Sequence, residues 1–258
     1  MARAMWKGVI RFGDVKVPVK LYAAVKDRTI HFRLLHRKDQ APVRQVMVNP
    51  ETEEVVPYES TRRAFDTGEG SLVVLTDDDL EEIEPKASRD IEILQFLPPA
   101  AIDHRWYQRP YFLGPDDGAG AAYASLTRAL QRSGREGLAR WVMRKKEYLG
   151  ALRLQAGYPM LVSLRYAEEV VSVAELEAPE GPSLATRELD MARQLVDMLT
   201  AEFDPTEYRD QYRHRVEELI ETKARGGRVR RKPATRQRAP EDLTHALEAS
   251  LKQERKRA

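Results

Sequence analysis

The sequence contains no cysteine among its 258 residues, which excludes disulfide bonds and zinc sites built from thiolates. It lacks any run of 18 apolar residues, and no apolar segment near the N-terminus resembles a secretory signal peptide. The absence of cysteine also fits a reducing compartment. We therefore expect a cytoplasmic protein with no membrane partner.

Signatures of the common enzyme classes are also missing. No Walker-type GK[ST] loop and no GxSxG elbow occurs. Gly118 and Gly120 lie where a dinucleotide-binding turn would be found, but Tyr123 replaces the third glycine of that motif. Because no parallel βαβ unit follows, the sequence favours a simple turn that caps a helix.

Metal sites are not indicated either. The five histidines have no metal-ligand spacing: His31, His36, His104, His214 and His245. The acidic residues 77–84 are an alternative, because they could hold Mg²⁺ for a nuclease. A short helix with carboxylates in its first turn explains them better, since acidic groups favour the positive end of the helix dipole. We expect no cofactor, no bound metal and no enzymatic activity.

Charge is distributed unevenly along the chain, although the net charge is only +2. Residues 223–258 carry a net charge of +8, and residues 1–222 a net charge of −6. Within that acidic part, residues 1–46 hold 11 basic and 3 acidic side chains, and residues 128–153 hold 8 and 2. This asymmetry predicts a polyanionic partner; ordinary surface salt bridging is the alternative.

The stretch WKGVIRFGDVKVPVKLY, residues 6–22, predicts a β-hairpin turned at Gly13 and Asp14. Val15, Val17, Val19 and Leu21 alternate with polar positions, as in a strand with one buried face. Lys16 and Lys20 lie on the other face. Further strands are expected over 30–34, 43–48, 54–58, 71–75, 91–97, 106–113, 138–144, 148–154 and 160–165.

Short connections between these strands predict a mainly β fold with some α-helix, in which an antiparallel barrel carries extended bridging arms. Thr76 should cap a short helix, and a longer helix is expected over 118–132. Residues 1–185 would form this core and its bridge. We expect the core to bury Trp6, Tyr22, Phe32, Trp106 and Trp141.

The C-terminal third changes to helical spacing. Residues 186–227 predict a helical arm of two helices, the first capped by Thr186 and the second starting at Asp204-Pro205. Residues 228–258 read as a basic tail, disordered through its Arg/Pro-rich part. Leu243, Leu247 and Leu251 form a short apolar stripe that needs a partner surface to be stable as a helix.

Basic residues on strands and loops, without a recognition helix or zinc finger, predict nucleic-acid binding through phosphates without sequence readout. The candidate DNA-binding residues are Arg28, Arg33, His36, Arg37, Lys38, Arg44, Arg62, Arg63, Arg144, Lys145, Lys146, Arg228, Arg230, Arg231 and Lys232.

Several blocks resemble the bacterial Ku proteins: residues 6–22, VLTDDDL at 74–80, IEIL at 91–94, RPYFL at 109–113, RKKEYL at 144–149 and LTAEFDP at 199–205. The resemblance runs in order over about residues 1–225. It implies a homodimer whose barrels and bridging arms close a ring around double-stranded DNA ends. It also implies a nucleoid-associated role in non-homologous end joining, with recruitment of the multifunctional DNA ligase D through the C-terminal region.

One departure concerns metal. Some relatives carry a Cys-x-x-Cys pair where this chain has Asn49-Pro50-Glu51-Thr52, so zinc is not expected. We expect the dimer interface to involve the arms of about residues 30–65 and the helices of 186–225. An open, nucleoid-type DNA binder without end preference remains the alternative function.

Overall fold

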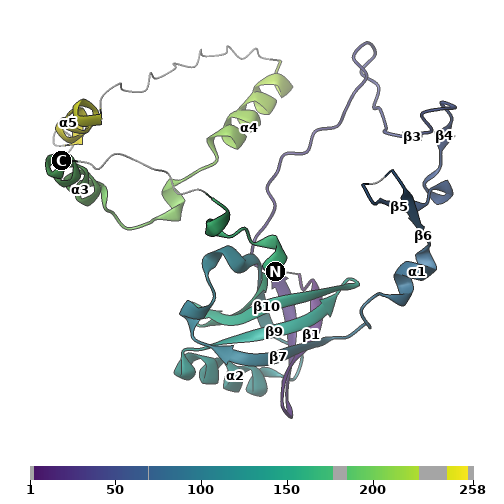
Figure 1. Ribbon diagram of the computed structural model, residues 1–258, viewed down its shortest axis with the longest axis horizontal. Helices are drawn as coiled ribbons and strands as arrows, with labels where there is room; N and C mark the ends of the chain where they lie inside the picture. Colours follow the sequence, from purple (N-terminus) through teal and green to yellow (C-terminus); the bar gives the residue numbers. More distant parts are fainter. Residues whose placement is uncertain (1–2, 69, 177–184, 227–242, 255–258) are drawn as a thin grey trace. The chain divides into compact units, whose positions relative to one another are not determined.

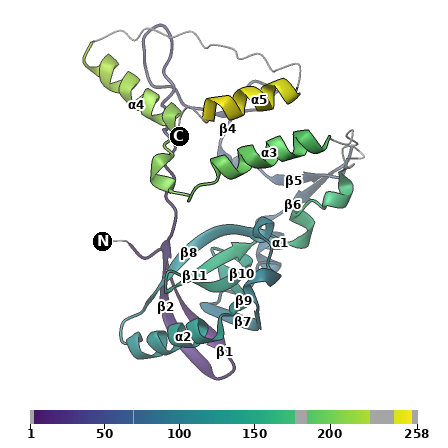
Figure 2. The same ribbon diagram turned by 90° about the vertical axis from the view of Figure 1, so that its left-hand side faces the viewer.

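The computed structural model describes residues 3–68, 70–176, 185–226 and 243–254. The chain divides into two units, Met1–Glu175 and Leu176–Ala258, which are described separately. Figures 1 and 2 show their helices and strands in two views.

The first unit contains a closed β-barrel of seven strands in the order β1-β2-β8-β11-β10-β9-β7 (Figure 1). The strands are β1 (Trp6–Phe12), β2 (Val15–Ala23), β7 (Asp90–Leu97), β8 (Tyr107–Pro115), β9 (Glu136–Met143), β10 (Lys146–Gln155) and β11 (Tyr158–Leu164). Neighbours pair antiparallel except β7, which closes the barrel parallel to β1. The expected antiparallel barrel is confirmed.

The opening hairpin forms as predicted. β1 and β2 pair in register from Trp6 opposite Leu21 to Phe12 opposite Val15, and Gly13 adopts the φ of 54° that the tight turn requires. The alternating side chains Val17, Val19 and Leu21 are all buried in the barrel. Val15 belongs to the same alternating face but is 46% exposed, because it lies next to the turn and beyond the packed interior.

Helix α2 (Gly120–Ser133) packs on β2, β8 and β10 and buries Leu126 and Leu130 (Figure 1). Gly118 has a φ of 78° in the turn before it, and the Tyr123 hydroxyl donates to the Leu113 carbonyl at 2.7 Å. Since β8 lies between the antiparallel strands β2 and β11, no βαβ unit exists here. The prediction of a capping turn is therefore confirmed.

A buried carboxylate joins three strands of the barrel. Glu136, at the start of β9, is 3% exposed. It accepts a hydrogen bond from the Tyr107 hydroxyl at 2.8 Å and pairs with the Arg153 guanidinium at 3.1 Å. Burial and the hydrogen bond to Glu136 together raise the pKa of Tyr107 to about 12. These contacts satisfy a charge that would otherwise be costly to bury.

Between β2 and β7 the chain runs through residues 24–89, here called the arm. It contains the two-stranded sheets β3 (Met47–Val48) with β4 (Val55–Val56) and β5 (Arg63–Asp66) with β6 (Leu72–Leu75), followed by α1 (Asp77–Glu82). The ribbon predicted around residues 49–52 and the cap at Thr76 are confirmed.

The strand expected over residues 30–34 is wrong. No neighbouring strand pairs with this segment, and only an isolated bridge joins Leu35 to Pro42. Alternation alone does not form a strand, because the backbone groups also need a partner to bond. For the same reason Phe32, expected in the core, is 67% exposed.

The second unit contains α3 (Thr186–Leu199), α4 (Gln211–Ala224) and α5 (Leu243–Glu254). Two predicted helix starts are corrected. Thr186 is the first residue of α3 and not its cap; the Glu188 carboxylate accepts from the Ala185 amide at 2.9 Å. Asp204 caps only a single turn, Pro205–Glu207, and α4 begins after Asp210, whose side chain accepts from the Arg213 amide.

A glycine allows close packing between β10 and a core tryptophan. A Cβ atom on Gly150 would lie 2.5 Å from the Trp141 ring and 2.6 Å from the Val162 carbonyl oxygen. We predict that Gly150→Ala lowers the free energy of unfolding by about 3 kcal/mol, because backbone and a buried ring must both move. Denaturant titration of the variant measures the change.

Gly120→Ala is the matched control. A Cβ at Gly120 meets nothing within 4 Å, and the residue opens α2. The free energy of unfolding of this variant should rise by about 0.5–1 kcal/mol, because alanine restricts the conformations of the unfolded chain. Equal stability of the two variants would contradict the packing described for Gly150.

Candidate nucleic-acid interface

Eight of the predicted DNA-binding residues lie in the arm, and all of their side chains are exposed: Arg28, Arg33, His36, Arg37, Lys38, Arg44, Arg62 and Arg63. They occupy loops and short strands and not one face of a helix. Lys26, which lies two residues before Arg28 in the same basic stretch, is exposed as well, although it is not among the predicted contacts.

A small hydrogen-bonded loop presents two of these cations at its tip. The Val43 amide donates to the Leu34 carbonyl at 3.1 Å, and the His36 amide donates to the Ala41 carbonyl at 2.8 Å. Arg37 and Lys38 lie in the turn between these bonds. Within the described residues neither of them forms an ion pair, so both charges remain available to a partner.

His36 has a different role in this loop. Its Nδ1 lies 2.8 Å from the Asp39 carboxylate, which also accepts from the Ala41 amide. These bonds, led by the one from Ala41, hold the pKa of Asp39 below its usual range. His36 therefore helps to close the turn that carries Arg37 and Lys38, and it is less available for a phosphate.

The other arm cations line two hollows. Arg44 borders a hollow of about 710 Å³ beside β3 and β4. Arg62 and Arg63 border another of about 560 Å³ between β5 and the start of α1. Arg63 lies 4.0 Å from the Asp77 carboxylate, and both side chains are mostly exposed, so water screens this pair strongly.

Two of the acidic residues in the segment 77–84 form close contacts within the protein. Asp79 accepts from the Thr76 hydroxyl and from the Thr76 amide, the latter at 2.8 Å in a capping box, and these bonds lower the pKa of its carboxyl. Glu84 pairs with Lys145 at 2.9 Å. Among the described residues no cluster of histidine and acidic side chains has the arrangement of a metal site.

Three predicted DNA-binding residues lie in the barrel, at the hairpin between β9 and β10: Arg144, Lys145 and Lys146. Arg144 and Lys145 both have positive φ, 53° and 62°, the conformation in which Asn-Gly is usually found. Both residues carry a Cβ atom, which comes too close to the following carbonyl oxygen at positive φ, so the turn is strained. Lys145 is fixed by its ion pair with Glu84, whereas Arg144 is exposed and forms no ion pair within the described residues.

Lys146, the first residue of β10, lies with its ammonium 5.7 Å from the centre of the Tyr148 ring. That ring in turn stacks on Trp141 at 5.3 Å. Of the three basic residues here, Arg144 is therefore the one whose charge has no partner within the described barrel. The sequence placed all three in one group, since it does not show which of them is already paired.

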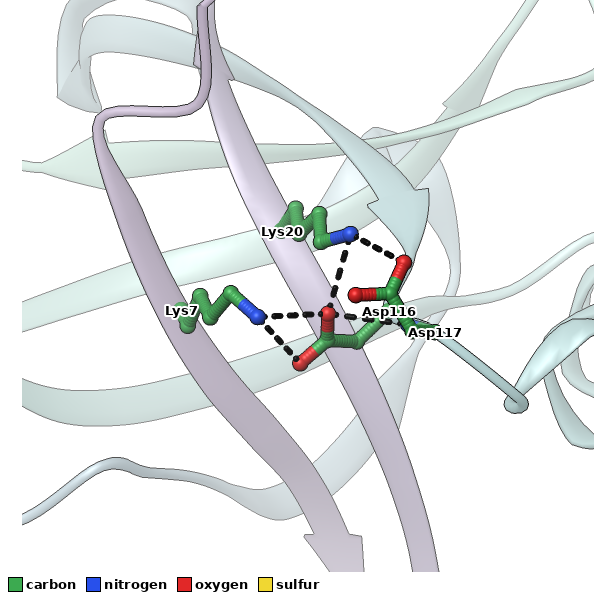
Figure 3. A network of polar contacts seen from close by, with 4 residues as sticks. All are labelled: Lys7, Lys20, Asp116 and Asp117. Atoms are coloured by element: carbon green, nitrogen blue, oxygen red, sulfur yellow. Dashed lines mark hydrogen bonds and ion pairs between the residues drawn. The ribbon is translucent and has the colours of Figure 1, made fainter.

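Two of the three lysines of the opening hairpin, Lys7 and Lys20, are also paired (Figure 3). Lys7 binds Asp116 at 2.9 Å, and Lys20 binds Asp116 at 3.1 Å and Asp117 at 2.7 Å. The hydrogen bond from Lys7 and those from the Asp117 amide and Lys20 hold the pKa of Asp116 well below its usual range. The network ties β1 and β2 to the turn after β8, and it removes two lysines from the candidate surface.

Four predicted residues, Arg228, Arg230, Arg231 and Lys232, lie outside the described residues. No helix within the described ranges is both long and apolar enough to cross a membrane.

The fold and this surface define a class of protein: a closed barrel from which a long, exposed arm extends between two strands, with a basic stretch in its first part, residues 24–46. Comparison with known families is consistent with that class, because the Ku70/Ku80 beta-barrel domain matches residues 11–191. The chain belongs to the Ku family.

Relatives match over nearly the whole chain. "Non-homologous end joining protein Ku 2" of Geotalea uraniireducens is 38% identical over 96% of this chain and 97% of its own length. The "Non-homologous end joining protein Ku" of Mycobacterium tuberculosis is 36% identical over 88% of this chain and 85% of its own. That of Bacillus subtilis is 35% identical over 98% and 82%.

The strained turn gives a test of this geometry. We predict that Arg144→Asn raises the free energy of unfolding by about 1 kcal/mol, because asparagine tolerates positive φ and arginine does not. Denaturant titration provides the measurement. Lys146→Asn, which removes the same charge two positions later, at the start of the strand, is the control and should not stabilise. If both variants shift alike, the effect is one of charge and not of turn strain.

Proposed function

We propose that this protein binds the ends of double-stranded DNA without reading their sequence and acts in non-homologous end joining. In this proposal two copies form a ring that protects the ends and recruits the end-joining ligase. Membership of the Ku family and relatives named as non-homologous end joining proteins support the process.

The observation that carries the DNA-binding proposal is the loop of residues 34–43. It holds Arg37 and Lys38 in an exposed turn without an intramolecular ion pair among the described residues. Arg33 lies immediately before this loop and is exposed as well. Cations on a backbone-bonded loop suit contact with phosphates, which are the same in every sequence. A broken end has no fixed sequence, so its binder needs this kind of contact.

The ring proposal draws support from apolar side chains in the arm. Phe32, Leu34, Tyr58, Phe65 and Leu72 are each more than 60% exposed. Exposed apolar groups gathered along one segment are typical of a surface that binds another protein chain. We assign this surface to a second copy of the chain, so that the arms and the basic loop together surround the DNA.

The remaining parts of the proposal depend on the resemblance. Contact between the C-terminal region and DNA ligase D is proposed for residues 228–258, most of which lie outside the described ranges. We propose a binding role and not a catalytic one, since Asp79 and Glu84 serve the fold in the way described above.

An end-loading ring and an open DNA binder differ in one measurable respect. A closed ring threads onto a linear duplex but not onto a covalently closed circle of equal length. We predict strong binding to the linear form and weak binding to the circle, measured by gel shift at several salt concentrations. Binding should weaken with salt by roughly 0.9 in log affinity per log unit for each phosphate contact. Equal affinity for the circle would favour the open, nucleoid-type binder.

Charge reversal tests which residues meet the phosphates. We predict that the triple variant Arg33→Glu, Arg37→Glu and Lys38→Glu weakens end binding, because each glutamate repels a phosphate that the cation would bind. The salt slope should fall by roughly 0.9 for each phosphate that is no longer neutralised. Fluorescence anisotropy with a labelled duplex measures both quantities.

Lys16→Glu is the control for this triple variant. It makes the same kind of reversal at an exposed position of β2 that is not a candidate contact. Unchanged affinity in the triple variant would place the binding surface elsewhere, while the comparison of circles and linear DNA tests the ring separately.

A further inference from the structure

The second unit contains a contact between two helices that are far apart in the sequence. Helix α5 lies along α3, as both ribbon views show (Figures 1 and 2). The contact lies within one compact unit of the chain. The sequence indicated that the α5 stripe needs a partner surface, and the structure places that surface on α3.

The contacting face of α5 is an apolar stripe with helical spacing. Leu251 is 8% exposed, and Leu247 and Ser250 are partly buried, whereas Ala249 on the other side of the helix is exposed. Spacings of three and four residues place Leu247 and Leu251 on one face. This is the pattern of a helix that docks in a groove through leucine anchors.

The receiving face of α3 has matching spacing. Its positions i, i+3, i+4 and i+7 are Glu188, Met191, Ala192 and Leu195. Met191 is buried, and the other three are partly buried. Leu189 lies off this face and is 48% exposed although it is apolar. The buried face of α3 is therefore the side that α5 covers.

Polar contacts flank the apolar stripe and fix the register of the two helices. The Arg187 guanidinium binds the Glu248 carboxylate at 2.9 Å, and the Thr244 hydroxyl donates to the Glu188 carboxylate at 2.9 Å. Salt bridges between exposed groups contribute little free energy, but they select one alignment among several apolar ones.

We propose that α3 is a docking surface for the C-terminal helix of the same chain and that the pair forms a latch, meaning a contact that keeps the α5 stripe covered. A helix of 12 residues is marginal alone in water, so α5 depends on this surface or on another that replaces it.

The latch has a consequence for partner binding. A protein that recognises the Leu247 and Leu251 stripe through an apolar groove has to displace α3, because both would cover the same side chains. The C-terminal helix is then presented only after release. This inference goes beyond DNA binding and does not depend on it.

Hydrogen–deuterium exchange of the full-length protein tests the latch. Backbone amides of α5 should exchange at least about tenfold more slowly than those of an unstructured segment of the same sequence, since docking holds the helix. In Met191→Asp this protection should disappear, because a carboxylate replaces the central apolar contact of α3. The sequence of α5 is unchanged in this variant, so its intrinsic exchange rates are unchanged too.

Val196→Asp is the matched control on the same helix. Val196 is 65% exposed, so the same new charge there should leave α5 protected. A second pair covers the case in which Met191→Asp unfolds α3. Leu251→Asp should free α5 while the barrel stays protected, and Ala249→Asp should not free it.

Three results would overturn the latch: unprotected α5 amides in the unmodified protein, equal protection in Met191→Asp and Val196→Asp, or protection of α5 that rises with protein concentration. The last result would assign the docked helix to a second copy of the chain.

Discussion

Closure of the barrel is the constraint on which the first unit depends. β2 pairs with one edge of β1 and β7 pairs with the other, so the chain has to pass from one side of β1 to the other before the sheet can close. The arm makes that connection. It is therefore held at both ends. Ala23, the last residue of β2, pairs with Tyr111 of β8, and Asp90, the first residue of β7, pairs with Val9 of β1. A segment that carries the exposed cations and has no core of its own is thus attached to a rigid support, which limits the conformational freedom that binding has to remove.

Ion pairing then decides which of the many cations remain available. Lys7, Lys20 and Lys145 are each joined to carboxylates that lie 61 or more positions away in the sequence. Arg37, Lys38 and Arg144 have no such partner within the described residues. The last of these sits in a turn whose backbone favours asparagine or glycine. Strain of this kind is often retained at sites that bind a ligand, so Arg144 stays a predicted DNA contact.

The candidate site was predictable in composition but only partly in geometry. The sequence identified residues 1–46 as basic and indicated that the cations of the arm lie on loops and strands. It mistook residues 30–34 for a strand, because the alternation of Ile30, Phe32 and Leu34 has the period of a half-buried sheet. In the structure Phe32 and Leu34 face solvent and not a core. In the ring proposal these exposed apolar side chains meet a second copy of the chain.

Local patterns were sufficient for the features that depend on neighbours in sequence. The alternation of β2, the turn at Gly13, the cap at Thr76 and the spacing of α2 all follow from short-range sterics and burial, and the structure contains them. Long-range contacts were decided only by the tertiary structure. The parallel pairing of β7 with β1, the ion pair of Glu84 with Lys145 and the docking of α5 on α3 join residues whose approach depends on the whole chain. No local pattern encodes such pairs, because the free energy that favours them appears only when the barrel and the helices have formed.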